Sequence, residues 1–176
     1  LTPRAGVDRA IAILEKLVKD HPDVPQYLFD LSETYATLDD LGPPGSHDAD
    51  SQQTLPAERR LTKALELSLK LAADYPAVPE YRAARAHIYH KLGELRMWTR
   101  RSDQAEADHR QAVEIQASLV REYPDVPTYR IWLAAFRNSL ASTLVMRSGN
   151  GRSAAEAADL AAATVADLTT LLAARP

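Results

Sequence analysis

Hydrophobic residues recur with the period of an α-helix along almost the whole chain. One such stripe contains Ala10, Ile11, Leu14, Leu17 and Val18, and residues three, four and seven positions apart share one face of a helix. We find no alternating run of β-branched residues bounded by turns, the pattern typical of a strand. The pattern therefore predicts an all-α fold of about seven helices, over residues 5–20, 26–41, 56–74, 79–100, 102–122, 127–147 and 153–174.

A six-residue motif, P-x-V-P-x-Y, occurs three times between these predicted helices. The copies span residues 22–27, 76–81 and 124–129, and their first prolines are 54 and 48 residues apart. The first proline cannot continue the incoming helix, and the second suits the first turn of the next helix. The motif predicts three similar hinges, and the fixed register of its tyrosines predicts that they pack between helices.

A small residue lies at the same distance before each hinge. Ala10, Ala64 and Ala112 each precede a hinge proline by twelve positions, which predicts a close helix crossing there. This spacing resembles that of the tetratricopeptide repeat (TPR) family, in which a small residue of the second helix precedes the closing proline by twelve positions. Further family positions, an aromatic and a small residue of the first helix, are matched by Tyr35, Tyr89, Ala86 and Ala134.

The chain departs from the family pattern in its period. The usual repeat has about 34 residues, Arg137 replaces the family aromatic, and Thr164 replaces the small residue in the last copy. The sequence is most similar to the long-helix variety found in large planctomycete-type bacterial proteins, some of which carry a serine/threonine kinase domain. The resemblance implies a right-handed superhelix, an α-solenoid of antiparallel helical hairpins.

The length of 176 residues is typical of one domain. We expect a single repeat domain over residues 1–176, interrupted by a mobile Pro- and Gly-containing insertion at about 42–55. We also expect it to be part of a larger protein. Since no polar capping helix is evident, the terminal helices are candidates for self-association.

Composition removes several classes of function. The chain has no cysteine, which excludes disulfides and thiolate chemistry, and its net charge of −3 offers no field for binding polyanions. No apolar run is long enough to predict a membrane span, and we expect a cytoplasmic protein.

Candidate catalytic and metal-binding patterns are weak. His87, His90 and Glu94 could share one helix face and hold a metal such as zinc, although a pair of surface or groove histidines is the favoured interpretation. A basic run near Trp98, with Arg96, Arg100 and Arg101, could stack on nucleic acid, but the acidic residues that follow favour a helix junction. Because neither a nucleophile elbow nor a glycine-rich phosphate loop is present, we expect no enzyme, no cofactor and no nucleic-acid partner.

The resemblance to the TPR family implies that the chain has a binding surface. In TPR arrays the first helix of each pair lines a concave groove, and its exposed positions give specificity. Carried over to this sequence, these positions predict a peptide- or helix-binding groove that includes Gln26, Phe29, Glu33, Thr37, Glu80, Ala83, His87, His90, Lys91, Thr128, Ile131, Ala135, Asn138 and Ser139. We therefore expect a non-enzymatic scaffold for a protein or peptide partner. The alternative is a regulatory or sensor region of a bacterial signalling protein such as a serine/threonine kinase.

Overall fold

The computed structural model describes residues 3–37, 54–147 and 151–173, and within these ranges it contains α-helices and no strand. The predicted all-α fold of seven helices is confirmed. In chain order the helices are α1 Pro3–Asp20, α2 Pro25–Tyr35, α3 Thr54–Asp74, α4 Pro79–Trp98, α5 Ser102–Glu122, α6 Pro127–Arg147 and α7 Gly151–Ala173.

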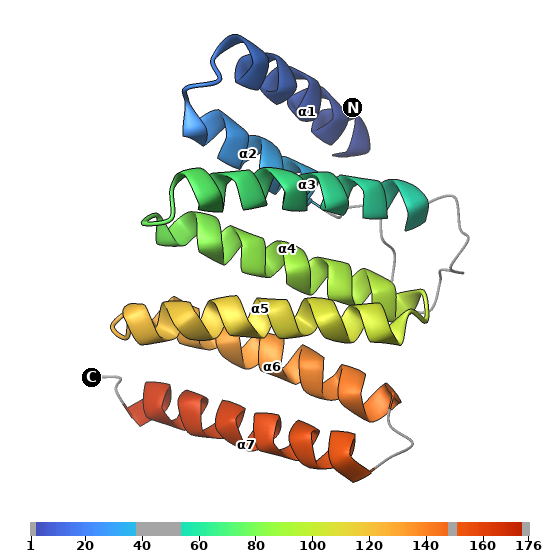
Figure 1. Cartoon of the computed structure of the whole chain (residues 1–176), viewed down its shortest axis with the longest axis vertical. Helices are drawn as coiled ribbons and strands as arrows, with labels where there is room; N and C mark the ends of the chain where they lie inside the picture. Colours follow the sequence, from blue (N-terminus) through green and yellow to red (C-terminus); the bar gives the residue numbers. More distant parts are fainter. Residues whose placement is uncertain (1–2, 38–53, 148–150, 174–176) are drawn as a thin grey trace.

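The helices are stacked in the order in which they occur along the chain (Figure 1). Each helix packs against the one before it and the one after it, and α4 also touches α6. The first and last described helices, α1 and α7, consequently lie at opposite ends of the longest axis (Figure 1). None of the helices in the described ranges is long and apolar enough to cross a membrane.

The three hinges share one backbone geometry. In each, the residue before the first proline closes the incoming helix with a 2.8 Å hydrogen bond, and its carbonyl accepts the N–H of the motif valine at 3.1–3.2 Å. Val24 and Val78 have closely similar extended conformations, with φ of −100° and −93°, and the second proline follows at the first helical position. The predicted hinges are confirmed.

Aromatic contacts repeat at the hinges as well. The ring before the first proline meets the motif tyrosine edge-on in all three copies, with centroids 6.0–6.1 Å apart, in the pairs His21–Tyr27, Tyr75–Tyr81 and Tyr123–Tyr129. Edge-to-face pairs at this distance are favourable. The tyrosines therefore pack inside the hinges, as their register predicts.

Two predicted helices end earlier than their patterns indicate. The helix predicted over 26–41 ends at Tyr35, and residues 38–41 lie outside the described part. At this end of α2, Lys91 Nζ of α4 donates a 2.7 Å hydrogen bond to the carbonyl of Ala36, the residue that follows the helix. The insertion predicted at 42–55 lies almost wholly outside the described residues, but Thr54 and Leu55 already belong to α3.

The helix predicted to reach residue 100 ends at Trp98 in a Schellman motif. The N–H of Arg101 donates to Arg96 O at 2.8 Å, and that of Arg100 donates to Met97 O at 3.1 Å. This arrangement requires a left-handed residue after the cap, and Arg100 takes it with φ of 59°. A non-glycine residue is strained in this conformation.

Small residues allow the helices to approach closely. Ala64, Ala86 and Ala112 are fully buried and Ala134 is 4% exposed, and the hydroxyl of Ser32 on α2 donates to the carbonyl of Ala64 on α3 at 3.1 Å. Ala10 of the terminal helix α1 is only half-buried.

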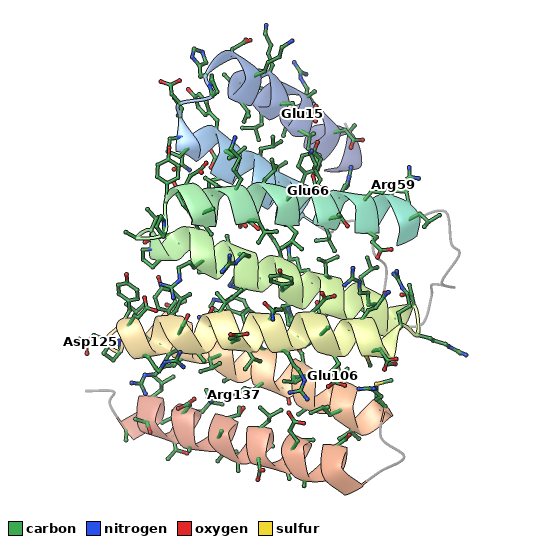
Figure 2. All side chains as sticks on the ribbon, in the orientation of Figure 1. Glu15, Arg59, Glu66, Glu106, Asp125 and Arg137 are labelled. Atoms are coloured by element: carbon green, nitrogen blue, oxygen red, sulfur yellow. The ribbon has the colours of Figure 1, made fainter. Side chains whose placement is uncertain are left out.

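Ion pairs tie neighbouring helices together. Arg82 of α4 makes a bidentate contact with Glu122 of α5 at 2.5 and 2.6 Å. Arg137 of α6 reaches Asp167 of α7 at 2.5 Å, and Figure 2 shows Arg137 at that interface. Bidentate and partly buried pairs of this kind restrict how one helix can turn against the next.

Enlarging a buried crossing residue tests the stack. We expect Ala112→Leu to lower the free energy of unfolding by about 1–3 kcal/mol, because the added atoms have no space between α5 and α6. Urea denaturation measures the loss. Ala107→Leu is the control, because Ala107 is exposed on the same helix; equal effects of the two substitutions would contradict the burial of Ala112.

Relieving the strained cap should stabilise the protein. We expect Arg100→Gly to raise the free energy of unfolding by about 0.5–1 kcal/mol, since glycine adopts positive φ without steric cost. Arg100→Ala removes the same side chain and keeps the strain, so it should produce no such gain in thermal or chemical denaturation. A gain in both variants would place the effect in the side chain.

Candidate functional site

Ring contacts join α2 to α4 and α4 to α6, and we call the surface that these three helices form the α2–α4–α6 face. On its first half, Phe29 of α2 packs against Tyr81 of α4 with ring centroids 5.3 Å apart. Lys91 joins α4 to the end of α2 through its bond to Ala36. Burial raises the pKa of Glu33, and the positive charge of Lys91 partly offsets this shift. The structure thus brings Phe29, Glu33 and Lys91 into one region.

The second half of the face contains aromatic and imidazole rings. His87 meets Trp132 edge-on at 4.2 Å and Phe136 at 5.2 Å between ring centroids. His90 lies 4.8 Å from the Phe136 ring, and its Nε2 is 2.9 Å from Ser139 Oγ. The histidines of α4 therefore fill the interface with α6, and the predicted residues His87, His90 and Ser139 meet there.

A third histidine, His109 of α5, lies behind this layer and is 2% exposed. Its Nδ1 is 2.9 Å from Thr143 Oγ1, and that hydroxyl donates its proton to Ser139 O. Nε2, the other ring nitrogen, is buried and has no hydrogen-bond partner in the described structure. The ring fits because α4 has Gly93 opposite it: a Cβ there would come within 2.4 Å of the imidazole.

The three histidines share an electrostatic environment. Burial is the largest influence on each, and it lowers the pKa of His87, His90 and His109 to about 4. Lys91 lowers the pKa of His87 and His90 further, whereas the backbone of His90 opposes the shift of His109. All three imidazoles are neutral at pH 7 as a result.

Next to these rings a cleft of about 310 Å³ opens between α4 and α6, with α5 at its base. Its lining combines apolar side chains with a carboxylate, an amide and hydroxyls: Glu94, Met97, Trp98, His109, Asn138, Ser139, Ser142, Thr143 and Met146. The volume is at the small end of ligand sites and suits a single side chain or a small group.

Ser139, His90 and Glu94 do not form a catalytic triad. In a triad the carboxylate orients the histidine through the nitrogen that does not face the serine. Here Glu94 Oε1 is 3.9 Å from Nε2, the same nitrogen that contacts Ser139. An imidazole with a pKa of about 4 is also a weak general base at neutral pH.

The metal alternative finds no support in the geometry. Within the described ranges, no group of three or more His, Asp or Glu side chains is placed to hold a metal ion. His87 packs on Trp132 and Phe136, while His90 contacts Ser139.

Two arginines of the basic run at the end of α4, Arg96 and Arg101, are engaged in ion pairs inside the protein. Arg96 pairs with Asp108 of α5 at 2.5 Å and lies 3.6 Å from Glu58 of α3. Arg101 reaches the same Glu58 carboxylate at 2.8 Å. These ion pairs join three helices, as expected for a helix junction.

Of the remaining predicted groove residues, Asn138 lines the cleft and the others described below do not. Gln26, Glu80 and Thr128 are exposed in the first turns of α2, α4 and α6, and Gln26 bonds to Asp30 of its own helix. Ile131 is 51% exposed one turn further along α6. Thr37 lies just beyond α2 and bonds to Glu33 O. Asn138 is exposed and lines the cleft beside Ser139.

Sequence reasoning missed Trp132, Met97 and Met146 as surface residues of this face. Trp132 is 40% exposed and Met146 is 75% exposed. A signal existed in part: Ser142, Thr143 and Met146 continue the helical spacing of Ser139 along α6. The contribution of Met97 depends on how α4 meets α6, which no local pattern encodes.

Compared with protein-family models, with curated proteins and with solved structures, the chain shows no significant similarity to any of them. Its function is therefore inferred from the geometry described above.

The buried neutral histidines make stability depend on pH. Because their pKa of about 4 lies below the usual 6.5, the unfolded chain binds more protons between these values. The free energy of unfolding should fall as pH is lowered from about 6.5 toward 4. Glu33, Glu94 and Asp108, whose pKa burial raises, act in the opposite direction and reduce the slope.

Substituting His87 alone isolates its contribution to the pH dependence of the free energy of unfolding. His87→Phe keeps an aromatic ring between Trp132 and Phe136 and should flatten the decline by up to about 1.4 kcal/mol per pH unit, the value for one proton. Urea midpoints between pH 4 and 7.5 measure it. An unaltered slope in His87→Phe would show that His87 is not held in its neutral form by burial.

Proposed function

We propose that this chain is a non-enzymatic interaction module whose α2–α4–α6 face binds an extended peptide or a helix of a partner protein. One observation carries the proposal. Trp132, Ile131 and Met146 keep 40%, 51% and 75% of their surface exposed on α6, a helix predicted to line a groove, and Met146 also lines the cleft. Exposed large apolar residues beside polar groups are typical of binding surfaces.

The rigidity of the stack supports this role. Hinges of one geometry and ion pairs such as Arg82–Glu122 hold the helices at set positions. A binding face that is already ordered loses little conformational entropy when a partner docks. Lys91 and His90, both on this face, are likewise held by contacts to α2 and α6.

The chemistry of the face suits a polypeptide. It combines an aromatic anchor, Trp132, with amide, hydroxyl and imidazole groups at Asn138, Ser139 and His87. Tryptophan is enriched among residues that dominate binding energy, and grooves for extended or helical peptides use such anchors with polar groups between them. Lys91 donates to Ala36 O, so it does not act as a free clamp for a terminal carboxylate.

We further propose that the stack is a section of a right-handed TPR-like superhelix. Contacts between successive helices, with α4 also touching α6, support an arrangement in which each unit buries the face of its neighbour. Self-association through a terminal helix is consistent with the exposed Val165, Leu168 and Leu172 of α7. A regulatory role beside a kinase domain stays a prediction.

A peptide selection tests the proposed function. Phage-displayed 12-residue peptides are selected on the immobilised chain, and the affinity of the best binders is measured by fluorescence anisotropy. We expect Trp132→Ala to weaken binding at least tenfold, because an interfacial tryptophan typically contributes more than about 1.4 kcal/mol.

The matched control is Leu69→Ala on α3, which removes an apolar side chain of similar exposure, 42%, away from the α2–α4–α6 face. Circular dichroism verifies that both variants are folded. Binders that are lost with Leu69→Ala and retained with Trp132→Ala, or a selection that yields no binder, would contradict the proposal.

A further inference from the structure

Two hydroxyls in the cleft between α4 and α6 already donate their protons to the backbone. That of Thr143 donates to Ser139 O at 2.9 Å, and that of Ser142 donates to Asn138 O at 3.0 Å. Each hydroxyl has one proton, so these two oxygens are left to accept further hydrogen bonds. The amide of Asn138, which also lines the cleft, can both donate and accept. The two hydroxyls therefore favour a ligand that supplies donors.

The carboxylate of Glu94, which lines the cleft, also accepts hydrogen bonds and favours a ligand that donates them. The side chain of Glu94 is 41% exposed, and the ion-pairing partner within 4 Å in the described structure is His90, 3.9 Å away. His90 is neutral at pH 7 and already contacts Ser139. Lys91, one residue from His90, directs its ammonium to Ala36 O. In the described structure Glu94 therefore has no Lys or Arg side chain within ion-pair distance, and the charge of Lys91 offsets only part of the rise that burial causes in the Glu94 pKa.

The apolar walls of the cleft suit the methylene stem of a lysine or arginine side chain. Met97, Met146 and the ring of Trp98 line it, and both Met97 and Trp98 are half-buried. Flexible thioethers pack well on methylene chains, and an aromatic face attracts a cation. Long basic side chains bury their stem and keep the charged head at a polar group.

We propose that this cleft receives the side chain of a lysine or arginine from a partner peptide, with its stem against Met97, Met146 and Trp98 and its charge on Glu94. The inference rests on the proposed peptide-binding function and adds the chemistry of one anchor residue. An acidic side chain would be repelled by Glu94, and an apolar one would leave that carboxylate desolvated and unpaired.

The two methionines of the chain, Met97 and Met146, allow a direct test. Both line the cleft, so ¹³C-labelled methionine methyl groups give two NMR signals that report on it. The probes are acetylated and amidated pentapeptides, Ala-Ala-X-Ala-Ala, in which X is lysine, arginine, norleucine or glutamate. We expect the lysine or the arginine peptide to shift both signals saturably and to bind at least about fivefold more tightly than the other two.

The variant Glu94→Gln should weaken the basic peptide about fivefold and leave the norleucine peptide unchanged. Glu114→Gln, which removes an exposed carboxylate on α5, is the matched control and should change neither. Equal binding of the norleucine and lysine peptides, or full affinity in Glu94→Gln, would overturn the proposal.

The peptide selection described above distinguishes failure of the basic-anchor proposal from failure of the proposed peptide-binding function. If selected peptides depend on Trp132 and carry no basic residue that needs Glu94, the face binds peptides and the basic anchor is wrong. If the lysine peptide binds through Glu94 and no selected peptide depends on Trp132, the anchor is supported and the wider groove is wrong.

Discussion

The structure depends on one constraint, the pair of prolines that ends one helix and begins the next. The first proline cannot take part in the helix before it, and the second is already in the conformation of the helix after it. In all three hinges the same short set of backbone hydrogen bonds and the same edge-on ring pair fill the corner. The same corner therefore turns the chain between α1 and α2, between α3 and α4, and between α5 and α6.

Stacking of this kind leaves helix surfaces that face no neighbour in the stack. Ala64, Ala86 and Ala112 become fully buried where helices cross, while the side of α6 that carries Trp132 and Met146 remains partly open. In a core closed on all sides these large side chains would be covered. Here Met146 lines the cleft and Trp132 remains 40% exposed, and the recognition that we propose uses this open side of α6.

Buried polar groups give the same face its chemical character. His109 fits against Gly93 and bonds to Thr143, and Thr143 in turn bonds to Ser139 O. This chain of contacts determines which atoms in the cleft can donate and which can only accept. The chemistry of the cleft therefore follows from how the interior is packed, and the recognition that we propose depends on interior packing as much as on surface residues.

The sequence by itself determined the helices, the hinges and the small residues at the crossings, because proline geometry and helical periodicity act over a few residues. It also placed Asn138 and Ser139 on the relevant face. Only the tertiary structure decided that Lys91 bonds to the carbonyl of Ala36, which lies 55 positions away in the sequence. It also decided that His90 meets Ser139 and that Met97 and Met146 line the same cleft, since these relations depend on how α4 and α6 approach, which no local pattern specifies.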